Sequence, residues 1–224
     1  MNIALVYIYP MNGAAPFWEK AVRFVESYHL NPPGIPHSTI IVCNNGDLSG
    51  PHNQLFSTLL NPTFIFHNNS GKDIGGYIKV AKTVPADLMV FCGATAYFRK
   101  PGWMGRVVES FQKHGDTAYS CTGHQGCGGV QPHLRTTGFW CRPSLLTEYC
   151  PEIISNDRRY EFEHGVTCFS TWLKNSGRTP WVVTQIGEYP LHACDSGPGG
   201  YHNGDQRNLL IGDRMTEPPY YVCS

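Results

Sequence analysis

Short apolar runs alternate with helix-like segments through the first half of the chain, and this alternation is the strongest constraint on its fold. The run Ile40-Ile41-Val42 is continuously apolar, as strands buried on both faces of a parallel sheet are. The expected strands cover residues 3–9, 37–43, 63–66, 87–91 and 117–120, and the expected helices cover 16–28, 53–60, 74–83 and 102–114. A strand–helix–strand order predicts an α/β domain with a mainly parallel central sheet flanked by helices.

The second half of the chain is less regular. Its expected elements are a glycine-rich loop at 123–129, a strand at 133–141, a short helix at 144–148, a helix at 163–174 and a strand at 181–184. The longer helix is expected because Val166, Phe169 and Leu173 follow helical spacing and Gly177 comes after its end. No repeat or linker divides the chain, so we expect one domain over residues 1–224.

Charge and composition exclude several classes of function. Seventeen basic and 17 acidic residues balance in 224, which does not indicate binding to nucleic acid or to an acidic membrane surface. No stretch approaches the length of about 18 apolar residues that a transmembrane helix needs. The segment from Met1 to Tyr7 has no basic region and is expected to be a strand, not a signal peptide. Nine irregularly spaced cysteines then indicate reduced, buried thiols and a cytoplasmic location.

A polar loop from Asn68 to Tyr77 joins an expected strand to an expected helix. Its glycines would let a ligand approach the backbone, and the helix N-terminus offers free N–H groups to anionic oxygens. Lys72 has the charge to bind a phosphate, and Asp73 can accept hydrogen bonds from sugar hydroxyls. The alternative is that Asp73 only caps the helix and the glycines only turn the chain.

Three segments together resemble GT-A-type nucleotide-sugar glycosyltransferases. Residues 40–47, Ile-Ile-Val-Cys-Asn-Asn-Gly-Asp, look like the second strand of those enzymes, which ends in a polar turn that holds the nucleoside. The loop at 69–77 is similar to their next ligand loop, in particular to the Asp-Ile-Gly-x-Tyr element of bacterial rhamnan-synthesis proteins. Phe162-Glu163-His164-Gly165 occupies the place where inverting members carry an acidic base. The resemblance implies a GT-A-like, Rossmann-type domain that serves polysaccharide synthesis.

The resemblance also implies that the two halves of the domain have different roles. Residues 1–122 would bind the nucleotide sugar, and residues 123–224 would hold the acceptor and the catalytic base. It implies an inverting glycosyltransferase with a nucleotide-diphosphate sugar as co-substrate and a glycan as acceptor. Glu163 is the expected base. The residues expected at the donor are Tyr7, Tyr9, Asn44, Asn45, Lys72, Asp73, Arg207 and Arg214. The residues expected around the donor–acceptor junction are His133, Arg135, Thr136, Thr137, Trp140, Glu161 and His164, with Trp103 as a second stacking platform.

Metal dependence is where the chain departs from this family. GT-A enzymes usually carry an Asp-x-Asp after the fourth strand, where this chain has Cys92-Gly93-Ala94-Thr95. Hard divalent cations prefer charged oxygen ligands, so we expect no strong requirement for such a metal. His202 is the remaining candidate metal ligand, by resemblance to a C-terminal histidine of some of these enzymes. A non-catalytic carbohydrate- or nucleotide-binding module that has lost the metal motif is the rival interpretation.

The sequence leaves more than one interpretation open for Glu163 and for two patterns that contain cysteine. If Glu163 begins a helix, the helix dipole favours its ionised form, but a simple helix cap is also typical of that position. Cys121-x-x-His124-x-x-Cys127, with His133 and Cys141 beyond it, has ligands suited to zinc in a spacing that is not typical of zinc sites. His164 and Cys168 are one helical turn apart, as a nucleophile pair would be, although a core role for Cys168 is favoured.

Overall fold

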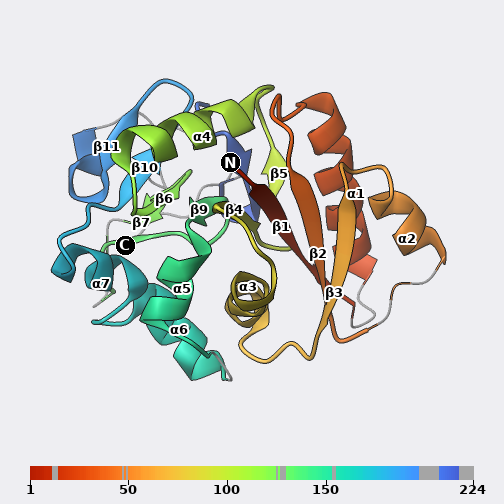
Figure 1. Cartoon of the computed structure of the whole chain (residues 1–224), viewed down its shortest axis with the longest axis horizontal. Coiled ribbons are helices and arrows are strands. Elements are labelled where there is room, and N and C mark those ends of the chain that lie inside the picture. The colour runs from red at the N-terminus through yellow and green to blue at the C-terminus, as the bar shows by residue number, and fades with distance from the viewer. Residues whose placement is uncertain are drawn as a thin grey trace.

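The computed structural model describes residues 1–11, 15–46, 48, 50–124, 126, 130–152, 155–196 and 207–216. A central sheet with helices on both faces dominates the structure (Figure 1). The strands of this sheet are β1 (Ile3–Pro10), β2 (Ser38–Asn44), β3 (Pro62–His67), β4 (Leu88–Cys92), β6 (Ala118–Ser120), β9 (Phe139–Cys141), β10 (Trp181–Val183) and β11 (Glu188–Pro190). Two small pairs join β5 (Tyr97–Phe98) to β12 (Ile211–Gly212) and β7 (Gly123–His124) to β8 (His133–Leu134).

The order of the strands is β11-β10-β6-β9-β4-β1-β2-β3. The strands expected at 3–9, 37–43, 63–66 and 87–91 are adjacent and parallel, with Val6 of β1 opposite Ile40 on one side and Phe91 on the other. β9 lies antiparallel between β4 and β6, and β11 is an antiparallel edge. The prediction of an α/β domain with a mainly parallel sheet is therefore confirmed.

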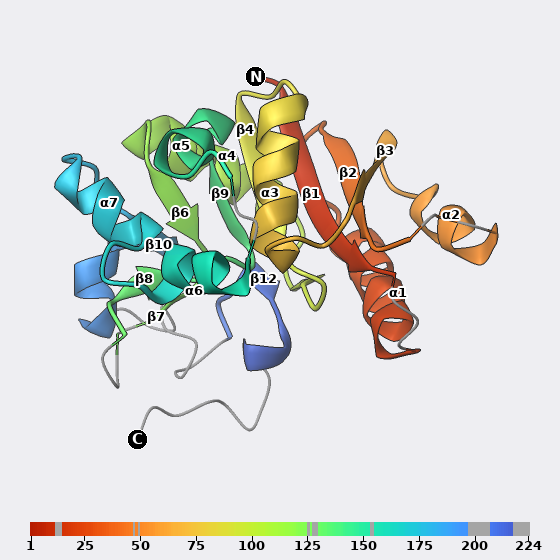
Figure 2. The ribbon, with the colours of Figure 1, turned by 90° about the horizontal axis from the view of Figure 1, so that it is seen from below.

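Helices cover the two faces of the sheet unequally. They are α1 (Ala15–Leu30), α2 (Gly50–Phe56), α3 (Lys72–Thr83), α4 (Trp103–His114), α5 (Pro143–Tyr149), α6 (Asn156–His164) and α7 (Phe169–Asn175), with short 3-10 turns at Leu191–Ser196 and Arg214–Thr216. Alternate residues of β1 face opposite cores: Leu5 and Tyr7 pack with α1 and α4, whereas Val6 and Ile8 pack with α3 and α5. α6 lies beside α3, so the second half of the chain meets the first there (Figure 2).

The expected helix at 163–174 is wrong in its boundaries. α6 ends at His164, the backbone of Gly165 is extended, and α7 begins only at Phe169. Val166, expected to be buried, is 72% exposed. The expected strand at 133–141 is likewise divided into β8 and β9, because the chain turns at Gly138, whose φ is +68°.

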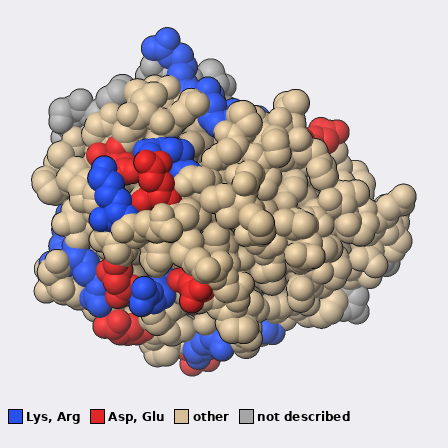
Figure 3. Space-filling view, turned by 45° about the horizontal axis from the view of Figure 1, so that its top comes forward, with Lys and Arg blue, Asp and Glu red and all other residues tan. Residues whose placement is uncertain are grey.

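The face of the molecule shown in Figure 3 has no patch of charges of one sign. On the face shown in Figure 3, acidic and basic side chains are interleaved on one side of the molecule, and most of the remaining surface is uncharged. Among the helices that the structure describes, none combines the length and apolar character needed to cross a membrane.

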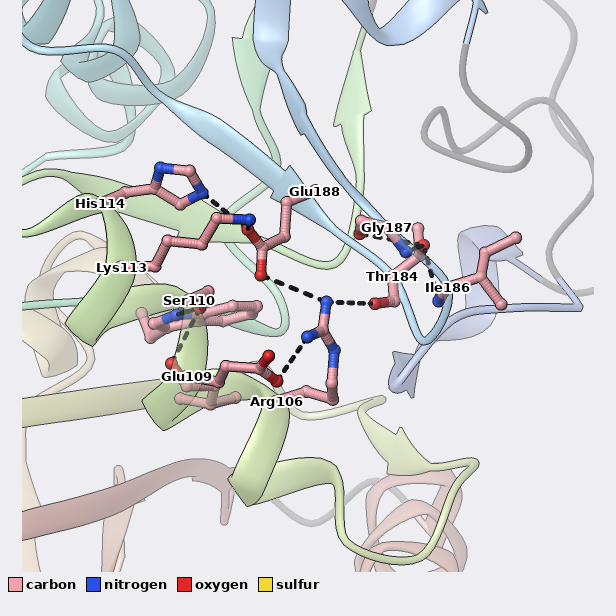
Figure 4. Close-up of polar contacts among 11 residues, drawn as sticks. Arg106, Glu109, Ser110, Lys113, His114, Thr184, Ile186, Gly187 and Glu188 are labelled. Carbon is pink, nitrogen blue, oxygen red and sulfur yellow. Dashed lines mark hydrogen bonds and ion pairs between the residues drawn. The ribbon is translucent and has the colours of Figure 1, made fainter.

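A buried carboxylate, Glu188, connects the start of β11 to α4 (Figure 4). Its side chain is 5% exposed and accepts hydrogen bonds from Lys113 Nζ at 2.9 Å, His114 Nε2 at 2.7 Å and Arg106 Nη2 at 3.3 Å. The ring of His114 stacks on Trp181. Burial alone would raise the pKa of Glu188, but the bonds from Lys113 and His114 outweigh it and lower the pKa.

Replacing Glu188 by Gln should therefore destabilise the fold in a pH-dependent way. A carboxyl whose pKa is lowered by folding stabilises above its unfolded pKa, about 4.3, and loses that contribution as pH falls through the folded pKa. We expect Glu188→Gln to cost about 1–3 kcal/mol of unfolding free energy at pH 7 and clearly less below pH 4. Urea unfolding checks this against Glu109→Gln, which removes an exposed partner of Arg106 and should cost under about 0.5 kcal/mol. Equal losses for the two variants would contradict the role of Glu188.

Candidate active site

A cavity of about 510 Å³ opens at the carboxyl ends of the central parallel strands. Ligands of open α/β sheets bind at this edge. The first half contributes residues from the ends of β1 and β2, from α1, from the start of α3 and from the loop after β4; the second half contributes the turn before β9, α6 and the segment after β12. The lining residues are Ile8, Pro10, Phe17, Asn44, Asn69, Lys72, Asp73, Gly93, Ala94, Thr95, Arg135, Thr136, Thr137, Arg159, Glu163, Asp213 and Arg214.

The loop between β3 and α3 is held by Asn44. The Nδ2 of this buried side chain donates to Asn69 Oδ1 at 3.0 Å, and its Oδ1 lies 3.0 Å from His67 Nδ1. Asn69 and Lys72 adopt left-handed backbone, with φ of +64° and +52°, which is uncommon for residues other than glycine. This loop brings Asn44, Lys72 and Asp73 to the same cavity, as their positions after neighbouring strands predicted.

Gly75 and Gly76, near the start of α3, serve packing, which the sequence interpretation missed. A Cβ on Gly75 would lie 1.8 Å from the carbonyl oxygen of Ser70, and a Cβ on Gly76 would lie 2.8 Å from Ile8 of β1. Neither glycine lines the cavity. Asp73 does not cap α3 either, because it stands in the first turn and the N-cap residue is Gly71, without a side-chain cap bond.

Gly75→Ala should therefore displace the ligand loop. The clash is with backbone, so the Ser70 region must move, and Asn69 and Lys72 move with it. We expect a loss of about 1–3 kcal/mol in unfolding free energy and weaker binding of the cavity's ligand. Gly105→Ala is the matched control, since a Cβ there meets nothing within 4 Å; that variant should be neutral or stabilising. Unfolding curves of the two variants, recorded together, check this, and equal stability would contradict it.

Glu163 closes α6 instead of opening a helix, so the helix dipole cannot be what favours its ionised form. Its Oε1 accepts hydrogen bonds from Thr136 N at 3.2 Å and Thr136 Oγ1 at 2.9 Å, and its Oε2 lies 3.8 Å from His164 Nε2. Burial alone would raise the pKa of Glu163, but His164, His133, Arg135 and the Thr136 bond outweigh it and lower the pKa. Burial lowers the pKa of His133 to about 4, so that ring is neutral at pH 7.

Asp73 is a second carboxylate of this region, and its environment shifts its pKa in the direction opposite to that of Glu163. Burial raises the pKa of Asp73, and the negative charge of Glu163 adds to the rise, whereas Arg159 and the N–H of Ile74 oppose it. Two neighbouring carboxyls with pKa values moved apart are a common arrangement where one group must stay ionised. Here the pKa of Glu163 is lowered and that of Asp73 is raised.

Three basic side chains line the cavity and form no ion pair with a carboxylate of the described residues: Lys72, Arg159 and Arg214. The Nε of Arg159 is buried and has no hydrogen-bond partner among the described residues. Arg135 differs, because its Nη1 and Nη2 bind Asp213 Oδ1 at 3.2 Å and Oδ2 at 2.7 Å. Arg135 therefore ties the segment after β12 to the site, and the other three cations face the cavity.

Four aromatic residues expected at the ligand lie in the core instead. Tyr7 stacks on Phe24 and donates to the carbonyl oxygen of Ala94, and the hydroxyl of Tyr9 bonds to His52. Trp140 is fully buried, and its Nε1 donates to Ser110 Oγ at 3.2 Å; Trp103 is buried as well. Strand alternation places Tyr7, Tyr9 and Trp140 on the face covered by α1 and α4, and Trp103 enters the same core from the start of α4. Their expected ligand contacts are therefore wrong.

The other expected site residues divide into two groups. Thr136 and Thr137 line the cavity, and His133 and His164 lie beside Glu163. The side chains of Asn45, Glu161 and Arg207 are exposed and do not line it. His202 lies outside the described residues.

The sequence interpretation missed several residues that line the cavity, among them Phe17, Thr95 and Arg159. Arg159 carried a readable signal, because it precedes Glu163 by four positions and so shares its helix face. That signal depends on placing both residues in one helix, and the expected helix began only at Glu163.

The cysteine-containing patterns do not form sites in the described structure. Cys121 and Cys141 are buried in the cores on opposite faces of the sheet, so one ion cannot bind both. Burial raises the pKa of Cys121 to about 12, and Cys127 lies outside the described residues. Cys168 is buried beyond the break after α6 and contacts Thr171 Oγ1, which agrees with a core role.

The donor metal of GT-A enzymes does not fit the described part of this cavity. The loop after β4 lines it with Gly93, Ala94 and Thr95, none of which offers a carboxylate. Asp213 follows β12, which pairs with β5 just beyond that loop, and both its carboxylate oxygens are bonded to Arg135. No step below is routed through such a metal.

Comparisons with known proteins identify the fold. No family model matches the chain, and no curated protein matches its sequence. The structure of mouse xyloside xylosyltransferase 1 aligns with 98% of this chain and all of its own, with a TM-score of 0.56 and 9% identity. A Pyrobaculum calidifontis mannosyltransferase in complex with GDP-Man and Mn2+ aligns over 66% of this chain and 46% of its own, with a TM-score of 0.50 and 12% identity.

A different enzyme class shares the architecture. A Bacillus anthracis protein assigned as a glucose-1-phosphate thymidylyltransferase covers 84% of this chain and 88% of its own, with a TM-score of 0.53 and 12% identity. The chain spans about half the length of the Staphylococcus aureus TarS structure that it also matches, 53% of it at a TM-score of 0.48 and 10% identity. The similarities to the xylosyltransferase and the mannosyltransferase show a GT-A-like fold.

Proposed function

We propose that this protein is a glycosyltransferase that moves a sugar from a nucleotide-diphosphate donor to a hydroxyl of a carbohydrate acceptor, with inversion. One observation carries the proposal: the ionised carboxylate of Glu163 and the cations Lys72, Arg159 and Arg214 line one cavity at the carboxyl edge of a GT-A-like sheet. The cations suit a diphosphate, and the carboxylate suits a proton acceptor.

The cavity walls suggest how the donor lies. Ile8, Pro10 and Phe17, from β1 and α1, form an apolar wall that suits a nucleobase, and Asn44 stands beside it. Lys72 and Arg159 come from α3 and α6, which meet at the junction of the two halves. A donor placed with its base on the first wall would extend its diphosphate and sugar toward Glu163.

The proposed reaction is a single displacement. Glu163 Oε2 accepts the proton of the acceptor hydroxyl as that oxygen forms a bond to the anomeric carbon of the donor. The bond between the anomeric carbon and the diphosphate oxygen breaks, and the nucleoside diphosphate leaves with the electron pair. Lys72, Arg159 and Arg214 stabilise the charge that develops on it. Thr136 holds Oε1 of Glu163, which leaves Oε2 for the acceptor.

Tyr160 replaces the buried tryptophans as the proposed acceptor platform. It is 49% exposed, and its ring stacks on His164, next to Glu163, with centroids 4.7 Å apart. A sugar ring on its open side would bring a hydroxyl near the base. We expect Tyr160→Ala to raise the acceptor KM roughly 10-fold and to change kcat far less, because it removes only stacking. Initial rates at varied acceptor concentration check this; an unchanged KM would contradict it.

The test of the proposed function is a panel of nucleotide sugars assayed for binding and for products. Sugar transfer releases a nucleoside diphosphate, whereas a nucleotidylyltransferase reaction releases pyrophosphate, so mass spectrometry of the products separates these classes. We expect nucleoside diphosphate and a glycoside, also in the presence of EDTA. Tight binding of a nucleotide sugar without turnover on any glycan offered would favour the non-catalytic module, and pyrophosphate release would favour the other enzyme class.

A further inference from the structure

Two imidazoles and a carboxylate converge beside the cavity. One ring nitrogen each of His133 and His164 and one oxygen of Glu163 all lie within 4.8 Å of one another. His133 is buried, His164 is 26% exposed in its side chain and Glu163 13%. The planes of the two histidine rings are inclined at 72°. The cluster unites β8 with the end of α6, two segments that are 30 positions apart in the sequence.

These three side chains are not bonded to one another as an ordinary network would be. The shortest contact between an imidazole and the carboxylate, His164 Nε2 to Glu163 Oε2, is 3.8 Å, too long for a hydrogen bond. The Nδ1 of His164 is buried without a partner among the described residues. The three ligand atoms are therefore close together but not bonded, and a shift of about 1 Å would bring them to the roughly 2.0–2.2 Å radius of a transition-metal ion.

Two of the three groups are oriented by hydrogen bonds to residues outside the cluster. His133 donates from Nδ1 to the carbonyl oxygen of Gln131 at 2.7 Å, which fixes the tautomer and leaves the lone pair of Nε2 available. Glu163 is held through Oε1 by Thr136, which leaves Oε2 turned toward His164. Outer partners of this kind are what orients the ligands of metal sites in proteins.

We propose that His133, Glu163 and His164 bind a divalent transition-metal ion of the zinc and cobalt class. Two imidazoles and one carboxylate are a known zinc donor set, and they disfavour Mg2+ and Ca2+, which prefer oxygen ligands. This site is separate from the donor metal of the fold, whose carboxylates the loop after β4 lacks. An ion here would occupy the oxygen that the proposed reaction uses as its base, so ion binding and base catalysis exclude each other.

The test is a Co2+ titration of the purified, metal-free protein, followed by visible absorption and by calorimetry. Co2+ gains intensity in its d–d bands when it leaves water for a four- or five-coordinate site, so the readout is independent of glycosyl transfer. We expect one ion per chain, displaced by Zn2+. We expect His164→Ala, at the accessible end of α6, to weaken the binding roughly 100-fold or more, and His133→Asn to do the same.

His29→Ala is the matched control, since His29 is exposed and remote from the cluster, and it should bind as the parent does. His202→Ala tests the other candidate histidine and should also bind as the parent does. Thermal melts of the metal-free variants establish that each is folded. Absence of a one-to-one site in the parent, or binding unchanged by His164→Ala in a folded variant, would overturn the proposal. Failure of the sugar-transfer assay would leave this result unaffected.

Discussion

Glu163→Gln should reduce the turnover of sugar transfer by about two to four orders of magnitude while leaving donor binding nearly intact. The amide keeps the shape of the side chain, and its oxygen can still accept the two bonds from Thr136. The amide nitrogen then faces the acceptor hydroxyl, and it cannot take a proton. Steady-state rates and donor affinity, measured on one preparation, separate the loss of chemistry from a loss of binding.

Glu161→Gln is the control for this variant. Glu161 lies on the same helix two residues away, is exposed and does not line the cavity, so its variant should turn over at close to the parent rate. Near-normal turnover of Glu163→Gln would reject Glu163 as the base. A drop in thermal stability with unchanged turnover per folded molecule would assign it a structural role instead.

Arg159→Gln should lower kcat roughly 100- to 1,000-fold, the second largest effect that we expect. A cation that meets charge developing on the leaving diphosphate stabilises the transition state more than the ground state. Arg159 lines the cavity, has a buried Nε without a partner among the described residues, and lies close enough to Asp73 to lower its pKa. The rate with saturating donor checks this.

Arg158→Gln provides the matched comparison, because Arg158 is the exposed neighbour on the same helix and does not line the cavity. It should leave kcat within about twofold, as expected for a surface charge. A further comparison separates electrostatics from positioning: Arg159→Lys keeps the charge and should recover part of the lost rate. Equal losses for the Gln and Lys variants would indicate that Arg159 acts by geometry alone, and an unchanged kcat in both would remove it from the mechanism.

The first half of the fold was predictable because its central strands, β1, β2 and β4, are buried on both faces. A run such as Ile40-Ile41-Val42 has few alternatives in an α/β chain, and the order β4-β1-β2-β3 follows from short connections. The convergence of Asn44, Lys72 and Asp73 follows in turn, because loops after neighbouring parallel strands share one edge. The second half was less predictable because β9 is antiparallel to its neighbours in the sheet. No local sequence pattern indicates the direction of a strand.

The sequence predicted which loops line the candidate site, but it did not predict which aromatic residues do. Tyr7 and Trp140 look like ligand platforms in the sequence, but strand alternation places both inside the core. Arg159 and Tyr160 were missed for one shared reason, the break in the helix at Gly165. Helical spacing across 163–174 concealed the break, and the residues that carry the proposed chemistry belong to the helix before it.

The stereochemistry of transfer tests the central claim most directly. Proton NMR of a reaction mixture distinguishes the anomeric signal of the nucleotide sugar from that of the new glycoside. A single displacement assisted by Glu163 predicts that the first glycoside formed has the anomeric configuration opposite to that of the donor. A product that retains the donor's configuration, or no glycoside from any nucleotide sugar that binds in the cavity, would contradict the account.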